Sequence, residues 1–185
     1  MVNRSKMGAT ISKGESLVQH DLNRGLEADY ALVAYGGNDS DYDWAAIDAD
    51  PAGDHRPRTE LPAFREKLRH TVTMLRERGI QPVLMSLPPI DAVRYLAFIC
   101  RGGLRKERIM DWLGDVQMIY RHQEMYSDAV TQLAYAEGLP LIPVREEFLN
   151  DHRLMRLIAA DGIHLTMPGY ERLFDTLADW LRIRV

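Results

Sequence analysis

The 185-residue chain has a single cysteine, no long apolar run and only a small excess of one charge. One cysteine, Cys100, excludes an internal disulfide and any zinc site built from several cysteines. No apolar stretch reaches the length of about 20 residues that a membrane-spanning helix needs, and residues 1–6 lack the apolar centre of a secretion signal. We therefore expect a cytoplasmic protein without a membrane span.

The charge and composition indicate a soluble globular domain. A formal net charge of −4 at pH 7 provides no general attraction to nucleic acid or to anionic membranes, so we predict no nucleic-acid partner. The one basic patch, Arg101 to Arg108, is interpreted as solvated surface. Hydrophobic residues make up 46% of the chain and charged residues 27%, and no repeat, low-complexity tract or linker divides it. We predict a single domain over residues 1–185.

Strand-like and helix-like segments alternate along the chain. Three short aliphatic runs, residues 30–35, 82–87 and 139–144, are typical of buried parallel strands. Helical periodicity and caps predict helices over four ranges: 14–26, 61–78, 106–137 with a break near Gly114, and 168–183. A surface loop is expected over residues 48–62. This order predicts an α/β fold with a parallel sheet and helical crossovers.

The tetrapeptide Asp161-Gly162-Ile163-His164 precedes the last expected helix. The three-residue offset lets the carboxylate of Asp161 accept a hydrogen bond from Nδ1 of His164, which leaves the other ring nitrogen to act as a general base. Thr166 is the expected N-cap of the following helix. The alternative interpretation is that Asp161 caps a turn and His164 is an ordinary half-buried histidine. The tetrapeptide alone does not decide between these two interpretations.

A polar turn follows the first expected strand, where functional groups of open α/β sheets are found. In the run Gly36-Gly37-Asn38-Asp39, the Asn38 amide can donate to a developing oxyanion, and Asp39 can hold the loop by accepting from backbone amides. The alternative is an ordinary hydrophilic turn. Calcium binding by this aspartate-rich turn is disfavoured, because the glycine and the acidic closing ligand of an EF-hand loop are out of pattern. We predict no metal.

Taken in order, three segments resemble the later sequence blocks of the SGNH hydrolases, also called GDSL esterases and lipases. The segments are residues 3–10, 36–39 and 161–164, so the resemblance covers essentially the whole chain. It implies a three-layer α/β/α domain with a flavodoxin-like parallel sheet. It also implies a serine esterase or lipase that cleaves carboxylic esters, of a small or carbohydrate-linked acyl group, without a cofactor.

The resemblance carries four catalytic roles to this sequence. His164 would be the general base and Asp161 its orienting partner. The backbone N–H of Gly8 and the side-chain amide of Asn38 would stabilise the oxyanion. In the family, the nucleophile is a serine in an N-terminal Gly-Asp-Ser block, which follows the first strand.

The first strand and the Gly-Asp-Ser block are the parts of the family pattern that this sequence lacks. The nucleophile is therefore unknown, because none of the five serines weighed as substitutes has the context of a nucleophile elbow: Ser5, Ser12, Ser16, Ser40 and Ser86. Two functions stay open. The first is an ester hydrolase that is inactive in this chain because the Gly-Asp-Ser block is absent. The second is a non-catalytic ligand-binding or interaction module on the same fold.

The missing block also has a structural consequence. The resemblance implies that the family's first strand pairs beside the strand at residues 30–35, which would otherwise present an open apolar edge. Open edges attract partners. We expect either an upstream segment or a second copy of the chain, in a homodimer, to cover this edge.

Overall fold

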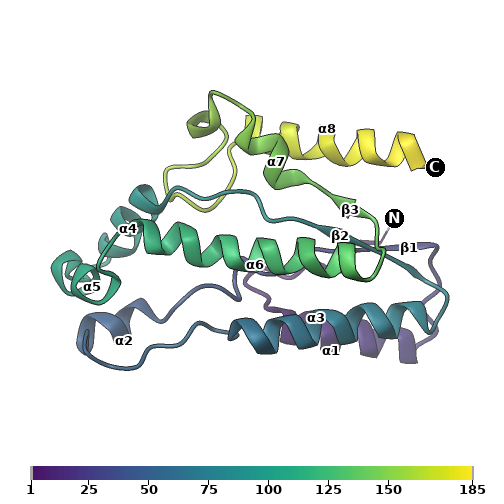
Figure 1. The fold of residues 1–185 in the computed structure, drawn as a ribbon, viewed down its shortest axis with the longest axis horizontal. Helices are drawn as coiled ribbons and strands as arrows, with labels where there is room; N and C mark the ends of the chain where they lie inside the picture. The colour runs from purple at the N-terminus through teal and green to yellow at the C-terminus, as the bar shows by residue number, and fades with distance from the viewer. Residues whose placement is uncertain (1, 185) are drawn as a thin grey trace. The chain divides into compact units, whose positions relative to one another are not determined.

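The computed structural model describes residues 2–184, which divide into two compact units. The first unit comprises residues 2–41, 56–87 and 125–141, and the second comprises residues 42–55, 88–124 and 142–184. Each unit has its own cluster of buried apolar side chains. Figure 1 shows the elements of both units.

The first unit contains the sheet. Its elements are α1 (Ile11–Asn23), β1 (Tyr30–Val33), α3 (Leu61–Arg76), β2 (Gln81–Met85), the second half of α6 (Gln117–Ala136) and the start of β3 (Leu141–Ile142). The strand order is β1-β2-β3, and β1 pairs with β2 in parallel. The predicted α/β class with a parallel sheet is confirmed, and β1 lies at an edge of the sheet.

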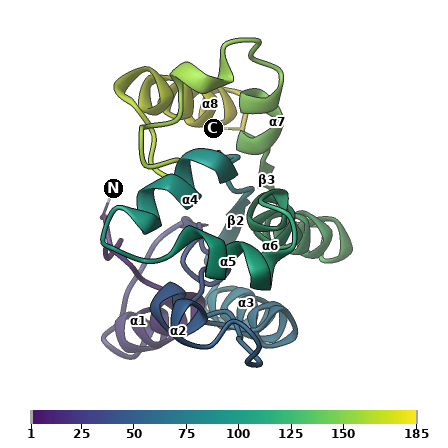
Figure 2. The ribbon, with the colours of Figure 1, turned by 90° about the vertical axis from the view of Figure 1, so that its left-hand side faces the viewer.

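The core of the first unit forms where α3 presents one apolar stripe. Phe64, Leu68, Val72 and Leu75 recur at helical spacing, and each is at most 1% exposed. The Phe64 ring packs against the ring of Tyr126 with 5.1 Å between centroids. Helices α1 and α3 lie side by side in this unit (Figures 1 and 2). The helical periodicity read from the sequence therefore corresponds to the buried face of α3.

The second unit is helical. Its elements are α2 (Trp44–Ala49), α4 (Ala92–Cys100), α5 (Lys106–Leu113), the first half of α6, α7 (Val144–Leu149), a 3-10 helix (Leu154–Arg156) and α8 (Met167–Arg184). Its core gathers around Trp44, whose Nε1 donates to the hydroxyl of Tyr95 at 3.3 Å. Helix α5 ends at Gly114, whose φ of 68° favours glycine, at the predicted break.

The observed strands are shorter than predicted. The first ends at Val33 and the second at Met85, before the Gly36 turn and before Pro88-Pro89. The third is reduced from residues 139–144 to Leu141–Ile142, because the prolines on both sides of this pair have no N–H for a sheet ladder.

The helices also differ from the prediction at several ends. Helix α1 covers Ile11–Asn23 instead of residues 14–26, and the expected loop at residues 48–62 includes the end of α2 and the start of α3. Helices α2, α4 and α7 were not predicted, since six to nine residues are too few to show a helical period clearly. The signal that marks two of them is their N-cap, Asp43 and Asp91, whose side chains accept from backbone N–H groups.

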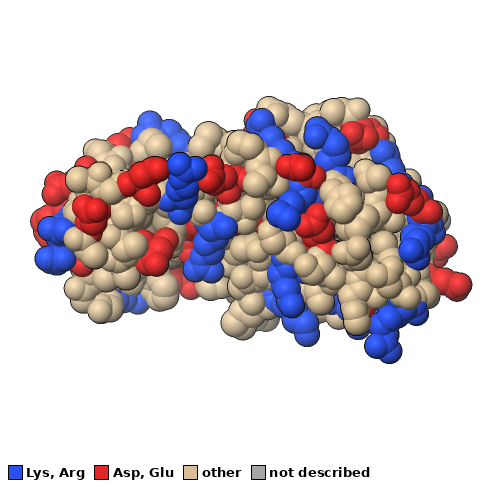
Figure 3. Space-filling model, turned by 90° about the horizontal axis from the view of Figure 1, so that it is seen from below, with Lys and Arg blue, Asp and Glu red and all other residues tan. Residues whose placement is uncertain are grey.

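Charges of both signs are interspersed on the surface seen in Figure 3, without a continuous basic area. The predicted solvated patch at residues 101–108 is partly neutralised, because Nε of Arg105 donates to Oδ1 of Asp48 at 3.0 Å. Nη2 of Arg108 donates to the carbonyl of Ala49 at 2.7 Å. Across residues 2–184, no helix is both long enough and apolar enough to cross a membrane.

Candidate active site

Asp161 and His164 form a hydrogen-bonded pair in the loop that leads into α8. Oδ2 of Asp161 lies 2.7 Å from Nδ1 of His164. The other oxygen, Oδ1, accepts from the backbone N–H groups of Ile163 and His164, each at 3.0 Å. Burial raises the pKa of Asp161, but the hydrogen bonds from His164 and Ile163 outweigh it and hold the pKa below its usual value.

This geometry determines where the imidazole proton lies. An ionised carboxylate only accepts hydrogen bonds, so Nδ1 of His164 must carry the hydrogen that Asp161 receives. In the neutral imidazole, Nε2 then keeps its lone pair. The side chain of His164 is 67% exposed, whereas that of Asp161 is 21% exposed. The structure therefore agrees with the part of the alternative interpretation in which Asp161 caps a turn, but not with a half-buried His164. The role of His164 as a general base stays a prediction.

The loop around this pair is closed by its own backbone. Ile158 and Leu165 form an antiparallel bridge, and the N–H of Ala159 donates to the carbonyl of His164 at 2.8 Å. Gly162 has a φ of 84°, in the left-handed region that glycine adopts without strain. Residues 161–164, the Asp161–His164 turn, thus form the tip of a closed loop.

Thr166 ends the loop and starts α8. Its Oγ1 accepts from the N–H of Gly169 at 3.2 Å and donates to the carbonyl of Arg156 at 2.6 Å. Thr166 is therefore the N-cap, as the sequence predicts, and it also ties the start of α8 to the segment that enters the loop.

The predicted oxyanion donors lie in the first unit. Asn38 follows β1, and its Nδ2 donates to the carbonyl of Ala9 at 3.2 Å. A side-chain amide has two hydrogens, so one hydrogen of Asn38 is left for another acceptor. Gly8 is exposed and has a φ of 70°. Both groups have the donors that their predicted roles need, and these roles stay predictions.

Asp39 is fully buried and joins the turn after β1 to the start of α1. Its two carboxylate oxygens lie 2.9 and 3.2 Å from the N–H of Ile11. Burial raises the pKa of Asp39, although hydrogen bonds from Thr59, Ile11 and Gly36 act in the opposite direction. These contacts are of the kind that the predicted loop-supporting role requires. The structure thus brings residues 8–11 next to the turn that carries Asn38.

The serines have local contacts that do not identify a nucleophile. Oγ of Ser16 donates to the carbonyl of Ser12 at 3.0 Å, within α1. Ser40 is buried, and its Oγ donates to the carbonyl of Gly37 at 3.0 Å. Ser86 is 4% exposed at the end of β2, and Ser5 lies in an exposed segment. The nucleophile stays unassigned.

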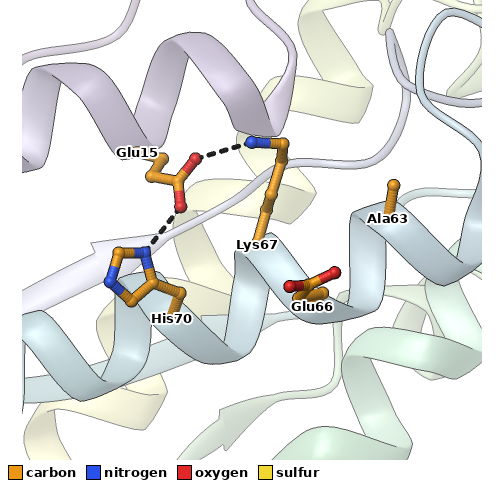
Figure 4. A pocket seen from close by; sticks show the side chains of 5 residues that line it. All are labelled: Glu15, Ala63, Glu66, Lys67 and His70. Carbon is orange, nitrogen blue, oxygen red and sulfur yellow. Dashed lines mark hydrogen bonds and ion pairs between the residues drawn. The ribbon is translucent and has the colours of Figure 1, made fainter.

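A charged pocket lies on the face shared by α1 and α3. It is lined by Glu15, Ala63, Glu66, Lys67 and His70 (Figure 4). The Glu15 carboxylate accepts from Nζ of Lys67 at 2.9 Å and lies 2.7 Å from Nδ1 of His70. None of the predicted site residues lines this pocket, so we interpret it as an ion-pair cluster that joins the two helices. Among the described residues, no three His, Cys, Asp or Glu side chains are grouped so that they could hold a metal.

Asp91, the N-cap of α4, and Arg94, in its first turn, are the residues near the Asp161–His164 turn that sequence reasoning missed. Nη1 of Arg94 donates to the carbonyls of Met155 and Ile158. The Asp-x-x-Arg spacing would have indicated a helix N-cap, but nothing local indicates its distant partners.

The sequence model of the GDSL-like lipase/acylhydrolase family matches residues 1–172. No protein with a curated description matches the sequence. Among solved structures, the fold is similar to the lipase/acylhydrolase from Enterococcus faecalis, with a TM-score of 0.61 and 18% identity, over 96% of this chain and 72% of that chain.

Two further solved structures are similar over nearly the whole chain. One is the acetylxylan esterase Axe2 from Geobacillus stearothermophilus, with a TM-score of 0.65 and 16% identity, over 97% of this chain and 70% of that chain. The other is LAE5, an alpha/beta hydrolase enzyme from the metagenome of Lake Arreo, with a TM-score of 0.66 and 19% identity, over 97% of this chain and 71% of that chain. More than a quarter of each of these chains has no counterpart here. The similarities confirm the predicted fold type.

Proposed function

Because the chain belongs to the GDSL-like lipase/acylhydrolase family, a family of ester hydrolases, we propose that it supplies the base, its orienting acid and the oxyanion donors of a serine esterase. The observation that supports this most directly is the 2.7 Å hydrogen bond between Asp161 and His164, with Nε2 of the exposed imidazole left as the base. The substrate we propose is a carboxylic ester.

The proposed chemistry is acyl transfer in two stages. Nε2 of His164 takes the proton of a serine hydroxyl as that oxygen attacks the ester carbonyl, and the imidazolium then gives the proton to the departing alcohol. Water repeats the sequence on the acyl-enzyme and releases the carboxylic acid. Asp161 keeps the imidazole in the Nδ1-protonated tautomer, and Gly8 and Asn38 donate to the oxyanion. Neither stage needs a cofactor or a metal.

We propose that the serine is not among the 185 residues and that the chain alone is inactive. The sequence has no Gly-Asp-Ser tripeptide, and the hydroxyls of Ser16 and Ser40 donate to carbonyls nearby. A catalytic mutant of Axe2 replaces a serine by alanine.

The acyl group we propose is small or linked to a carbohydrate. The support is the similarity of fold to Axe2, which is described as an acetylxylan esterase. An active, extended form should hydrolyse p-nitrophenyl acetate with a higher kcat/KM than p-nitrophenyl octanoate. The opposite preference would contradict the small acyl group and leave the ester hydrolase unaffected.

A fluorophosphonate probe and intact-mass measurement test the nucleophile. The folded 185-residue chain should give no adduct, whereas a chain extended by an upstream Gly-Asp-Ser block should give one adduct. His164→Ala in the extended chain should abolish that adduct, because the base is removed. A single His164-dependent adduct on the 185-residue chain would instead show that one of its own serines is activated, and peptide mapping would identify it.

Kinetics of the extended chain test the oxyanion donor. Loss of one such donor costs about 10²–10³ in kcat, so Asn38→Ala should lower kcat by this order with little change in KM. A rise in KM alone would refute the assignment of Asn38.

A non-catalytic ligand-binding module on the same fold is the second candidate, and the missing serine favours it. In this function, Asn38 and His164 would donate hydrogen bonds to a ligand instead of a transition state. If the extended chain folds, gives no fluorophosphonate adduct and hydrolyses no ester, this second function is preferred.

We also propose that a second copy covers the open edge of β1 in the 185-residue chain. Tyr30 and Leu32 of this edge strand are 48% and 50% exposed, and the strand carries neither charge nor proline to block pairing. Sedimentation velocity should give a homodimer. A stable, well-folded monomer would count against it.

A further inference from the structure

The first turn of α4 is built around the carboxylate of Asp91, whose side chain is 11% exposed. Oδ1 of Asp91 accepts from the backbone N–H groups of Val93 and Arg94, both at 3.1 Å. Oδ2 lies 3.2 Å from Nε of Arg94. One edge of the Arg94 guanidinium is therefore held by the N-cap of its own helix.

The other end of the guanidinium binds the segment that leads into the Asp161–His164 turn. Nη1 of Arg94 donates to the carbonyl of Met155 at 3.1 Å and to that of Ile158 at 2.8 Å. The Met155 carbonyl belongs to the last turn of the 3-10 helix Leu154–Arg156, where backbone carbonyls lack partners within the helix, and the Ile158 carbonyl follows that helix by two residues. Arginine binds all three oxygens with two nitrogens of one rigid fork, which the single nitrogen of lysine cannot reproduce.

The Asp161–His164 turn packs against the start of α4. The N–H of Asp91 donates to the carbonyl of Gly162 at 2.8 Å. A Cβ at Gly162 would lie 2.5 Å from the carbonyl oxygen of Asp91 and 2.5 Å from the backbone nitrogen of Tyr95. Two groups therefore hold the loop on α4: the Arg94 side chain at the entering segment and the backbone of Asp91 at the tip.

We propose that Arg94 is a positioning residue for His164. Its bonds to Met155 and Ile158 hold the entering segment, and the bridge between Ile158 and Leu165 transmits this constraint to the residues that follow His164. Without the guanidinium, the loop is free to shift against α4, and the contact between the imidazole and Asp161 is weakened. That Arg94 thereby assists catalysis rests on the proposed function, whereas its effect on the position of His164 can be measured in the 185-residue chain without any activity.

The test is the tautomer of His164, read from long-range ¹H–¹⁵N spectra of the ¹⁵N-histidine-labelled 185-residue chain. The signals of His164 are assigned from their loss in His164→Gln. In the unmodified chain we expect the Nδ1-protonated form, because Asp161 accepts from Nδ1. In Arg94→Lys, the share of this form should fall by about twofold or more, toward the Nε2-protonated form that free histidine prefers.

Arg78→Lys is the matched control. Nη1 of Arg78 donates to the carbonyl of Leu22 at 2.9 Å in the first unit, so this variant also replaces an arginine bound to a backbone carbonyl. We expect it to leave the His164 signals unchanged. A loss of the Nδ1-protonated form in both variants would show a general loss of stability and overturn the positioning role.

Asp91→Asn is the second variant, to be used if Arg94→Lys does not fold. The amide keeps an acceptor for the helix cap but removes the negative charge that holds Arg94, so the His164 tautomer should shift in the same direction by a smaller amount. An unchanged tautomer in the folded variants overturns the proposal. This measurement needs no ester hydrolysis. An Arg94-dependent tautomer, together with an extended chain that folds but hydrolyses no ester, would therefore refute the proposed function alone.

Discussion

Replacing Gly162 by alanine should destabilise the chain more than the same substitution at any glycine with open space around it. Gly162 has a φ of 84°, where an alanine costs about 1–2 kcal/mol. Its Cβ would also lie 2.5 Å from two backbone atoms of α4, which cannot move as the end of a flexible side chain does. Overpacking of this kind costs about 1–3 kcal/mol. The expected loss in the free energy of unfolding is therefore about 2–5 kcal/mol.

Gly79→Ala is the matched control for this prediction. Gly79 has a similar φ of 73°, and a Cβ there would meet nothing within 4 Å, so only the backbone cost of about 1–2 kcal/mol remains. Urea denaturation of the two variants and the unmodified chain, followed by circular dichroism, measures both losses. Equal losses in the two variants would show that the turn is not packed against α4 as described, and would refute the reasoning from contact.

Three further predictions concern the core of the first unit, buried Asp39 and half-buried His122. Phe64→Ala should lower the free energy of unfolding, measured by urea denaturation, by about 3–5 kcal/mol, because Phe64 is 0% exposed. Leu32→Ala, at a 50% exposed site, should lower it far less. Similar losses in the two variants would contradict the assigned core. Burial raises the pKa of Asp39, so the folded chain binds the proton of this carboxyl group more tightly than the unfolded chain does. The chain therefore loses stability as the pH rises from the ordinary pKa of 3.8 through the raised pKa. Asp39→Asn should remove this loss of stability. If the free energies of unfolding of the variant and the parent differ by the same amount at every pH in this range, the prediction is wrong. Burial lowers the pKa of His122, whose Nε2 lies 3.1 Å from the hydroxyl of Tyr42. The contribution of neutral His122 to stability is therefore complete above the ordinary pKa of 6.5 and is lost as the pH falls through the lowered pKa. His122→Gln should therefore show a smaller fall in Tm on acidification than the parent, and parallel Tm curves would argue against this.

Features that depend on neighbours within a few residues could be predicted from the sequence. The pairing of Asp161 with His164 spans three residues, so the conformation of one turn decides it. The N-cap at Thr166, the end of α5 at Gly114 and the buried stripe of α3 likewise depend on local geometry and on helical period. For the same reason, the order of strands and helices was sufficient to predict the α/β class.

Contacts between distant segments were decided by the tertiary structure alone. Arg94 meets Met155 and Ile158 across 61 and 64 residues, and Asp39 meets the N–H of Ile11 across 28 residues. Which carbonyl or amide a polar side chain reaches depends on how apolar faces pack, and many sequence positions carry suitable groups. The sequence by itself therefore determined which chemical groups the chain has and how the Asp161–His164 turn is formed. Only the packing of α4 against the loop decided what holds that turn in place, because a bond across 61 or 64 residues has no signature in the local pattern.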